Sequence, residues 1–406
     1  MSRRPLSGVR VLECASVIAG PYCAYTLTLL GAETIKIERP SQGDWMRNQG
    51  GDAALVAAGL GSAFLSCNAG KRSVALNLKD PRGVAIARQI AAGVDVMIEN
   101  WRPGTAARLG VGFEDIKAVN PRIVYCSISG FGQDGPMSPR PAYDHIIQAV
   151  SGIMSVTGTP ETAPSRTGPP LVDYLTGLSA AVAIVAALRE RDRTGEAQLI
   201  DVGMLDCAVA GMGSILSAHV NGNVPAAPVG NAAASGAPSS GLFATKTSPL
   251  SIVANTEAQF RALCGVLGRP ELVDDPRFRE PAVRKQNQDA LRAIIAATLA
   301  ERPAIEWEGL LAGAGIPVGA VRSVPELLDE AHVAARDLFR HLPLADLPLA
   351  ERGRDAVLPT AGFKLNGQRV APERGPPLLA ADNESVLAEL GYDESQRLAL
   401  RRDGVW

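Results

Sequence analysis

The sequence predicts an α/β protein with a large domain built on a parallel, Rossmann-like sheet flanked by helices, plus a smaller α/β domain. Three observations lead to this class. Short apolar runs typical of buried strands alternate with helix-like segments through the first half of the chain. A stretch near residue 225 is rich in Pro, Gly, Ala and Ser and has almost no charge. Helical and strand-like patterns then resume, and 406 residues are enough for two or three domains.

The first half of the chain has the order of βαβ units. Its strand-like runs are VRVLEC, ETIKIERP, SVALNL, VDVMIEN and RIVYCSISG. Helices are expected at YCAYTLTLLG, ending at Gly31, and at PRGVAIARQIAAG. From Asp173 the run YLTGLSAAVAIVAALRERDRTG predicts a long buried helix that stops at Gly195, and a further helix is expected after AQLIDVGML. Ligands of such parallel sheets collect at the carboxyl ends of the strands.

The second half begins after the uncharged stretch NVPAAPVGNAAASGAPSSG. Strands are expected at LSIVA and PVGAVRS, and amphipathic helices at TEAQFRALCGVLG, QDALRAIIAATLAER and AIEWEGLLAGAG. One helix is then expected at VPELLDEAHVAARD and one charged terminal helix at SVLAELGYDESQRLALRRDGVW. We therefore expect a large α/β domain over residues 1–200, a helix and linker over 201–225, a small α/β domain over 226–328, and a linker and C-terminal segment over 329–406 that returns to the large domain.

Charge and cysteine content exclude several classes of protein. With 40 basic and 42 acidic residues, no positive excess draws the whole molecule to nucleic acid or an anionic membrane. The six cysteines are scattered without C-x-x-C spacing, so neither a metal site nor a disulfide framework is expected. No apolar segment typical of a signal peptide or membrane span is found, which predicts a soluble, cytoplasmic protein.

Common catalytic motifs are missing from the sequence. The first strand-to-helix turn reads CASVIAGP and lacks the G-x-G-x-x-G fingerprint, which argues against a dehydrogenase. There is no P-loop and no G-x-S-x-G elbow, and none of the four histidines has triad spacing.

Basic residues follow several predicted strands: Arg39, Lys79, Arg102 and Arg108. Any one of them is more simply a solvated surface charge. Together, at one edge of a sheet, they would form a site for a phosphorylated ligand such as a nucleotide.

Two acidic positions remain ambiguous from the pattern alone. Asp173 precedes the long apolar helix and could be its N-cap, or a rigidly positioned nucleophile or base. Tyr143 and Asp144 are a second pair of polar residues directly before an apolar helical run. Their ordinary interpretation is a helix cap, with Tyr143 as a half-buried aromatic.

Taken together and in this order, several segments resemble the class III CoA-transferase family, which includes formyl-CoA, carnitine and dicarboxylate CoA-transferases and the related α-methylacyl-CoA racemases. The similar stretches are LSGVRVLECASVIAGPYCAYTLTLLGAETIKIERPSQGDWMR, NAGKRSVALNLKDPRG, VDVMIENWRPGTAARLGVGFEDIKAVNPRIVYCSISGFGQDGP, RPAYDHIIQAVSGIMSVTG and PPLVDYLTG through RTGEAQLIDVGMLD. They cover the first half densely, and the second half matches more weakly.

The resemblance implies roles for individual residues. It makes Asp173 the catalytic nucleophile, which can also cap its helix, and it places Asp144 and Tyr143 beside it, with Asp144 orienting the acceptor or Asp173. The implied CoA-binding positions are Val17, Ile18, Arg39, Leu76, Lys79, Asn100, Trp101 and Arg108. The basic residues would neutralise the phosphates, and neighbouring apolar positions would pack on the adenine.

The implied activity is transfer of CoA from an acyl-CoA donor to a carboxylic acid through an aspartyl anhydride and an aspartyl-CoA thioester. CoA is then a substrate, with no tightly bound cofactor. Racemases of this family have a His where Tyr143 stands, and a tyrosine is a poor base at neutral pH, so a transferase is favoured over a racemase. A non-catalytic nucleotide-binding protein is the remote alternative.

Substrate and assembly are also indicated by the resemblance. Formyl-CoA transferases have a run of glycines over the nucleophile, and NAAASGAPSSG has none. This departure favours a larger carboxylate, such as a dicarboxylate with succinyl-CoA as donor. Family members are interlocked homodimers, and the uncharged linker near residue 225 is compatible with that arrangement.

Overall fold

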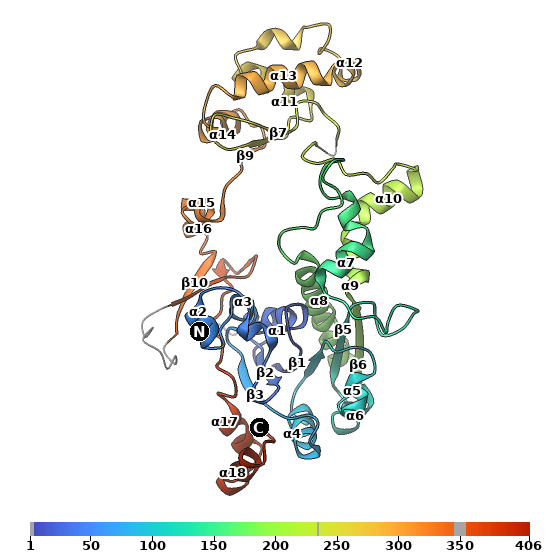
Figure 1. Ribbon diagram of the computed structural model, residues 1–406, viewed down its shortest axis with the longest axis vertical. Coiled ribbons are helices and arrows are strands. Elements are labelled where there is room, and N and C mark those ends of the chain that lie inside the picture. The colour runs from blue at the N-terminus through green and yellow to red at the C-terminus, as the bar shows by residue number, and fades with distance from the viewer. Residues whose placement is uncertain (1–3, 234, 345–354) are drawn as a thin grey trace. The chain divides into compact units, whose positions relative to one another are not determined.

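The structure, a computed structural model, describes residues 4–233, 235–344 and 355–406 (Figure 1). The described residues form two compact units. One lies within Met1–Ile153, Arg166–Val224 and Ala334–Trp406, and the other within Met154–Ser165 and Pro225–Val333. Each unit has a buried apolar core of its own.

The first unit contains a six-stranded parallel sheet with the order β3-β2-β1-β4-β5-β6. The strands are β1 (Arg10–Cys14), β2 (Glu33–Glu38), β3 (Arg72–Ala75), β4 (Val96–Glu99), β5 (Val124–Ser129) and β6 (Gln198–Gly203). The expected parallel sheet is confirmed. The sixth strand was not expected, because exposed and partly buried residues alternate along the first part of this edge strand, which therefore lacks a continuous apolar run.

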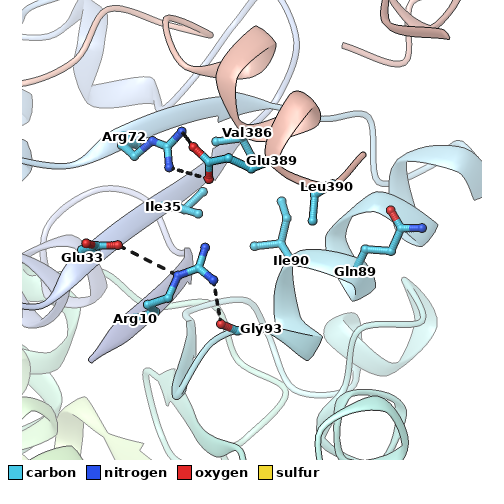
Figure 2. Close-up of a pocket in the computed structure, with 10 residues that line it drawn as sticks. All are labelled: Arg10, Glu33, Ile35, Arg72, Gln89, Ile90, Gly93, Val386, Glu389 and Leu390. Atoms are coloured by element: carbon cyan, nitrogen blue, oxygen red, sulfur yellow. Dashed lines mark hydrogen bonds and ion pairs between the residues drawn. The ribbon is translucent and has the colours of Figure 1, made fainter. Parts of the chain in front are cut away.

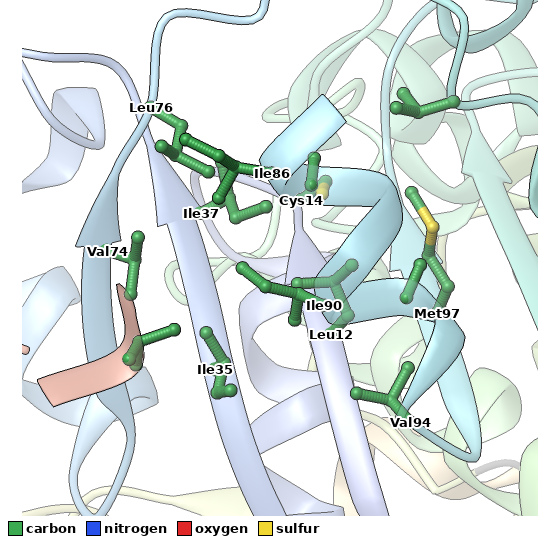
Figure 3. Packing of buried hydrophobic residues seen from close by; sticks show 14 of the residues in the cluster. Leu12, Cys14, Ile35, Ile37, Val74, Leu76, Ile86, Ile90, Val94 and Met97 are labelled. Carbon is green, nitrogen blue, oxygen red and sulfur yellow. The ribbon is translucent and has the colours of Figure 1, made fainter. Parts of the chain in front are cut away.

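Helices cover both faces of the sheet. On one face lie α4 (Pro81–Ala92), α6 (Phe113–Val119) and the C-terminal helices α17 (Asn383–Glu389) and α18 (Glu394–Arg402). Figure 3 shows Leu12 of β1 and Ile35 and Ile37 of β2 packed with Ile86 and Ile90 of α4. On the other face lie α1 (Ala19–Leu29) and α8 (Leu171–Thr194). This two-sided cover explains why the central strands are buried on both faces and mostly apolar.

The long helix α8 ends as predicted and begins earlier than predicted. Gly195, with φ of 79°, terminates it. It begins at Leu171, so Asp173 lies inside its first turn. By length and composition this helix could cross a membrane, but half of its most apolar window is buried, and core helices of soluble proteins share that character.

The first unit also contains shorter elements. Its other helices are η1 (Trp45–Asn48), α2 (Ala53–Ala57), α3 (Ser62–Asn68), α5 (Thr105–Arg108), α7 (Asp144–Ser151), α9 (Met204–Gly211) and α10 (Gly213–Gly222). Two antiparallel pairs are formed by β10 (Phe339–Pro343) with β11 (Asp355–Pro359) and by β12 (Lys364–Leu365) with β13 (Gln368–Arg369). The single terminal helix that was expected is instead α17 and α18, because Gly391 turns left-handed and Asp393 caps a new helix.

The second unit is built on a three-stranded antiparallel sheet, β7-β8-β9. Its elements are β7 (Gly241–Phe243), β8 (Leu250–Ile252), α11 (Glu257–Val266), η3 (Pro270–Val273), α12 (Pro281–Gln286), α13 (Gln288–Leu299), α14 (Ala304–Gly313), β9 (Val318–Ala320) and α15 (Val324–Leu328). At its boundaries are η2 (Ile153–Val156) and α16 (Ala331–Ala335). The single helix expected at VPELLDEAHVAARD is split in two. Helix α15 ends at Leu328 with Asp329 as its C-cap, and α16 begins at Ala331. Between them, the Glu330 side chain forms an ion pair with Arg322.

Candidate active site

The carboxyl edge of the parallel sheet gathers most of the residues that the sequence singled out. Because β3, β2, β1 and β4 are parallel neighbours, the segments that follow them open on one edge. The strand order reverses between β1 and β4, the point at which doubly wound sheets bind ligands. The predicted CoA-binding positions follow these strands: Val17 and Ile18 after β1, Arg39 after β2, Leu76 and Lys79 after β3, and Asn100, Trp101 and Arg108 after β4.

The loop between β1 and α1 has a left-handed residue at its centre. Val17 has φ of 73°, a conformation that is rare for a β-branched residue. Its N–H group donates to the two carboxylate oxygens of Asp44 at 3.2 and 3.3 Å. On the other side, Asn100 Oδ1 accepts from the Ser16 N–H at 2.9 Å, and Asn100 Nδ2 donates to the Ser16 carbonyl at 2.7 Å. The amide of Asn100 is therefore already engaged in bracing this loop.

The start of α1 provides uncapped backbone donors beside this loop. Ile18 is the N-cap residue, and no side chain caps the helix. Within the described residues, the N–H groups of Ile18 and Ala19 have no hydrogen-bond acceptor. Such groups carry the partial positive charge of a helix N-terminus, which suits an anionic oxygen.

Three of the predicted phosphate-binding side chains, those of Arg39, Lys79 and Arg108, are exposed. Arg108 donates to the Thr105 hydroxyl at 2.8 Å. No carboxylate among the described residues forms an ion pair with any of the three. Their positive charge is therefore accessible to a phosphate.

Leu76 and Trp101, two of the apolar positions predicted at this edge, are less exposed than the basic ones. Leu76 is 1% exposed and packs with Ile37 and Ile86 in the core (Figure 3), so its side chain does not offer the expected surface for adenine. Trp101 is half-buried against the same core, and its backbone N–H donates to Glu99 Oε2 at 2.8 Å.

Asp173 is not the cap of its own helix, contrary to one expectation from the sequence. The N-cap is Pro170, and no side chain of the local segment caps it. Asp144, in the first turn of α7, accepts from the Val172 N–H at 2.8 Å and from the Asp173 N–H at 3.1 Å through Oδ2. The capping donors are thus taken by a carboxylate from another helix. Among the described residues, none donates a hydrogen bond to the carboxylate of Asp173.

Gln148 holds Asp144 in this position from one turn further along α7. Its Nε2 donates to Asp144 Oδ1 at 2.5 Å and to Thr167 Oγ1 at 3.0 Å, and its Oε1 accepts from the Thr167 N–H at 3.0 Å. Both Asp144 and Gln148 are buried. Gln148 was not predicted as a site residue, although its spacing of four residues from Asp144 places both on one helix face.

Burial, and then the nearby charge of Asp144, raise the pKa of Asp173 from its usual 3.8 to about 7. The Asp173 residue is 8% exposed, so its ionised form is poorly hydrated. A poorly hydrated carboxylate without hydrogen-bond donors is a better nucleophile than one in water. Perturbed carboxyl groups of this kind concentrate at functional sites.

Tyr143 is not brought into this buried arrangement. It is 57% exposed and forms no capping hydrogen bond through its side chain, although it is the N-cap residue of α7. Glu99, which the sequence analysis did not select, is a second buried carboxyl at the same edge. Burial raises the pKa of Glu99 to about 7. Its position at the end of an apolar strand was the signal that could have found it.

The described part of the chain contains neither a metal-binding cluster nor a disulfide. Within those residues, no group of three His, Cys, Asp or Glu side chains could hold a metal ion, and the six cysteines are buried, free thiols. A cleft of about 570 Å³ lies where β1, β2 and β3 begin, at the opposite edge of the sheet (Figure 2). Its Arg72 is paired with Glu389, and Arg10 donates to the Gly93 carbonyl. None of the predicted site residues lines this cleft.

These features describe a doubly wound α/β protein with a buried carboxylate at the ligand edge of its sheet. Comparison with known proteins narrows the class, because the family model described as CoA-transferase family III matches residues 6–383. The chain belongs to CoA-transferase family III, and it is a CoA-transferase.

Relatives of known activity match along most of the chain. Succinyl-CoA:glutarate CoA-transferase of Mus musculus is 38% identical over 405 residues, covering 100% of this chain and 91% of the mouse protein. Acetyl-CoA:oxalate CoA-transferase of Acetobacter aceti is 40% identical over 340 residues, covering 82% and 85%. Among solved structures, a CAIB/BAIF family protein from Brucella suis superposes with a TM-score of 0.85 at 30% identity, covering 96% of this chain and all of that one.

Proposed function

We propose that this CoA-transferase moves CoA from an acyl-CoA donor to a dicarboxylic acid, with Asp173 as the covalent nucleophile. The observation that carries the proposal is the buried Asp173 carboxylate, which has no hydrogen-bond donor among the described residues while Asp144 takes the N–H groups around it. Asp173 lies in the first turn of α8, which packs against α1. Helix α1 follows β1, where the strand order of the sheet reverses.

In the first half-reaction, an Asp173 oxygen attacks the thioester carbonyl and the CoA thiolate leaves, giving a mixed anhydride. The thiolate attacks the aspartyl carbonyl, releasing the donor acid as its carboxylate and leaving an aspartyl-CoA thioester. The acceptor carboxylate then displaces the thiolate, and the thiolate attacks the acceptor carbonyl of the new anhydride. Acyl-CoA leaves and the Asp173 carboxylate is regenerated, so no net proton transfer is required.

The protein's contribution to these steps is positioning and charge stabilisation. Arg39, Lys79 and Arg108 would bind the phosphates of CoA, which holds the thioester near Asp173. The uncapped N–H groups of Ile18 and Ala19 would stabilise the oxyanion that develops at the thioester carbonyl. Burial of Asp173 would keep water from the anhydride.

Dicarboxylates are proposed as acceptors because relatives over nearly the whole chain carry such substrates in their names. These include the succinyl-CoA:glutarate enzyme of the mouse and the acetyl-CoA:oxalate enzyme of Acetobacter aceti. Both glutarate and oxalate therefore belong in the first panel of acceptors, with succinyl-CoA and acetyl-CoA as donors. The six buried free thiols are compatible with the cytoplasmic location expected from the sequence.

A homodimer is part of the proposal. The α8 helix exposes an apolar stripe on one face, formed by Leu171, Leu175, Leu178, Val182 and Val185. The spacing of four and three residues is that of a helix–helix seam. A second copy of the chain would cover this stripe, as the family resemblance implies.

The proposal is tested by mass spectrometry of the protein after incubation with succinyl-CoA or acetyl-CoA. We expect an adduct of CoA mass on the Asp173 peptide, removed by hydroxylamine and absent in Asp173→Asn. Asp192→Asn, an exposed position at the far end of the same helix, is the matched control and should retain the adduct. Binding of CoA without any trapped adduct, together with deuterium uptake at the α carbon of a 2-methylacyl-CoA in heavy water, would favour the racemase instead.

A further inference from the structure

Four fully buried charged side chains lie beneath the loop between β1 and α1. Lys36 Nζ is 2.7 Å from Glu13 Oε1 and 3.0 Å from Asp44 Oδ2, and Lys71 Nζ is 2.6 Å from Glu13 Oε2. The set contains two ammonium groups and two carboxylates, so it is electrically balanced. Buried charges of this kind contribute little to stability, because the free energy needed to remove them from water can exceed what their attraction returns, and apolar residues in their place are often equally stabilising. Their role must be sought in what else they contact.

These charges contact the backbone on both sides of the loop. Lys36 Nζ donates to the Ala15 carbonyl at 2.7 Å, and Lys71 Nζ donates to the Pro21 carbonyl at 2.9 Å. Between these points, the Val17 N–H donates to Asp44. The loop is thus held at its start, its centre and its end by one charged cluster.

The central contact holds a conformation that the sequence disfavours. Valine rarely adopts φ near 73°, because its branched Cβ crowds the backbone there. Strained residues of this type persist when their surroundings determine them, and they concentrate at functional sites. The turn at Val17 directs the chain into α1, whose Ile18 and Ala19 N–H groups have no acceptor among the described residues.

We propose that Glu13, Lys36 and Asp44 are positioning residues that hold Val17 in its left-handed conformation, so that the start of α1 is preformed to receive the thioester oxygen of acyl-CoA. This inference rests on the proposed function for its ligand. The positioning itself concerns the unliganded protein, where Asp44 is held by Lys36, and Lys36 in turn by Glu13. None of the three residues is expected to touch CoA.

The neighbouring Glu38–Arg47 pair makes no direct contact with this loop, although Glu38 Oε2 accepts from the Asp44 N–H at 2.8 Å. Arg47 binds Glu38 at 2.6 Å and donates to the Gly59 and Pro377 carbonyls, so it ties together other segments of the first unit. It makes no contact with residues 15–21 among its hydrogen bonds. Among these buried charged side chains, the direct contacts with the loop come from Lys36, Asp44 and Lys71.

The test uses a charge-balanced variant, Lys36→Met with Asp44→Leu, which leaves Glu13 paired with Lys71. We expect it to fold, to exchange the amide hydrogens of the 15–20 segment at least tenfold faster without ligand, and to bind CoA at least tenfold more weakly by calorimetry. Adding Val17→Gly should return CoA affinity to within about threefold of wild type, because glycine adopts positive φ without strain. A merely structural role of the cluster would not be rescued by this substitution.

Further variants keep the test decisive. Asp44→Asn retains an acceptor for the Val17 N–H, whereas Asp44→Leu removes the same charge without leaving an acceptor. We expect the Asn variant to lose less exchange protection and less CoA affinity than the Leu variant. Equal losses in these two variants would overturn the proposal even if the double variant fails to fold. Arg191→Met breaks the ion pair with Asp95 at the opposite edge of the sheet and should lower thermal stability without changing CoA affinity. Unchanged exchange and affinity in the double variant would also overturn it. Failure of the wild type to bind CoA would instead contradict the proposed function, while the exchange measurement would still report on the loop.

Discussion

Two carboxylates with similar sequence settings have different structural roles. Asp144 and Asp173 each stand in the first turn of a helix, and from the pattern alone either could be a cap. In the folded chain Asp144 caps α8 from outside, held by Gln148. Asp173 is thereby left at the same helix start with no side-chain donor among the described residues, as the proposed nucleophile requires. The two residues are therefore proposed to have separate roles, Asp144 in positioning and Asp173 in the reaction.

The raised pKa of Asp173 predicts a stability that depends on pH. Below pH 3.8 the side chain is protonated in folded and unfolded chains alike, and between 3.8 and about 7 only the folded chain keeps the proton. This contribution to stability is therefore lost as pH rises toward 7. Asp173→Asn has no such cost. We expect it to increase the free energy of unfolding at pH 8 by on the order of 2–3 kcal/mol, with a difference near zero at pH 4.

Urea unfolding at the two pH values measures this difference, with Asp192→Asn as the exposed control. If Asp173→Asn is no more stable than wild type at pH 8, the Asp173 carboxylate does not have the raised pKa that its burial predicts. The same variant is expected to lose transfer activity, so stability and function should change in opposite directions.

The charged cluster under the β1–α1 loop shows why sequence reasoning missed some residues. Glu13 and Lys36 stand inside runs that are otherwise apolar, VLEC and TIKIE, and a charge in a buried strand was the available signal. Asp44 lies in a loop whose sequence, PSQGDW, has no apolar periodicity that would indicate a buried residue. Only Asp44 contacts Val17, and it is held there through Lys36 and Glu13. The Lys36–Glu13 pairing depends on two neighbouring strands being in register, which no local pattern specifies.

At the level of helices, the site depends on how closely α8 approaches α1. A Cβ at Gly177 would lie 2.7 Å from the Ala19 carbonyl and 3.2 Å from the Cys23 nitrogen, so only glycine permits this contact. Asp173 is one turn earlier on the same helix face. The glycine therefore sets how closely Asp173, the proposed nucleophile, approaches the start of α1. Tyr22 and Tyr174 pack edge to face beside it.

Gly177→Ala is expected to push α8 away from α1. The predicted cost is about 1–3 kcal/mol of unfolding free energy, with a fall in kcat because Asp173 moves from the loop. Gly213→Ala, where nothing lies within 4 Å of the added methyl group, is the matched control and should be neutral or slightly stabilising. Thermal unfolding and steady-state kinetics of both variants test this. Equal behaviour of the two would show that the close approach is unimportant.

The expected helices and strands were recovered where local signals were strong. The Gly195 terminus of α8 and strands β1 to β5 follow from glycine and from continuous apolar runs. The terminal helix was expected as one piece because its apolar spacing continues past Gly391, whereas the left-handed glycine divides it. Edge strand β6 was missed because its exposed side removes the apolar run.

In the chain as a whole, the C-terminal segment packs on one face of the sheet of the first unit. The Asn77 N–H donates to the Val405 carbonyl at 2.8 Å, and Arg72 of β3 pairs with Glu389 of α17. Residues more than 300 positions apart thus share one core. The segment NAAASGAPSSG, where the resemblance would place a run of glycines, includes residue 234, which lies outside the described residues.

The apolar stripe on α8 predicts a dimer that charge would disrupt. Val182 is 70% exposed in the single chain, and burying it against a second copy would remove this apolar surface from water. We expect Val182→Glu to raise the dimer dissociation constant at least about tenfold, since an unpaired buried charge is costly. Leu398→Glu on α18, 54% exposed and off the stripe, should not. Sedimentation equilibrium distinguishes them, and a monomeric wild type would end the dimer proposal.

Local patterns were enough for the fold class and for the positions of the first five strands along the chain, and they marked Asp173 and Asp144 as acidic residues at helix starts. These features follow from apolar periodicity, glycine and proline punctuation, and motif order, which are properties of neighbouring residues. The capping of α8 by Asp144, the burial of Leu76 and the clamp on Val17 were decided only by tertiary structure. Each depends on side chains from separate strands and helices meeting at one sheet edge, and such distances are set by packing of the whole unit.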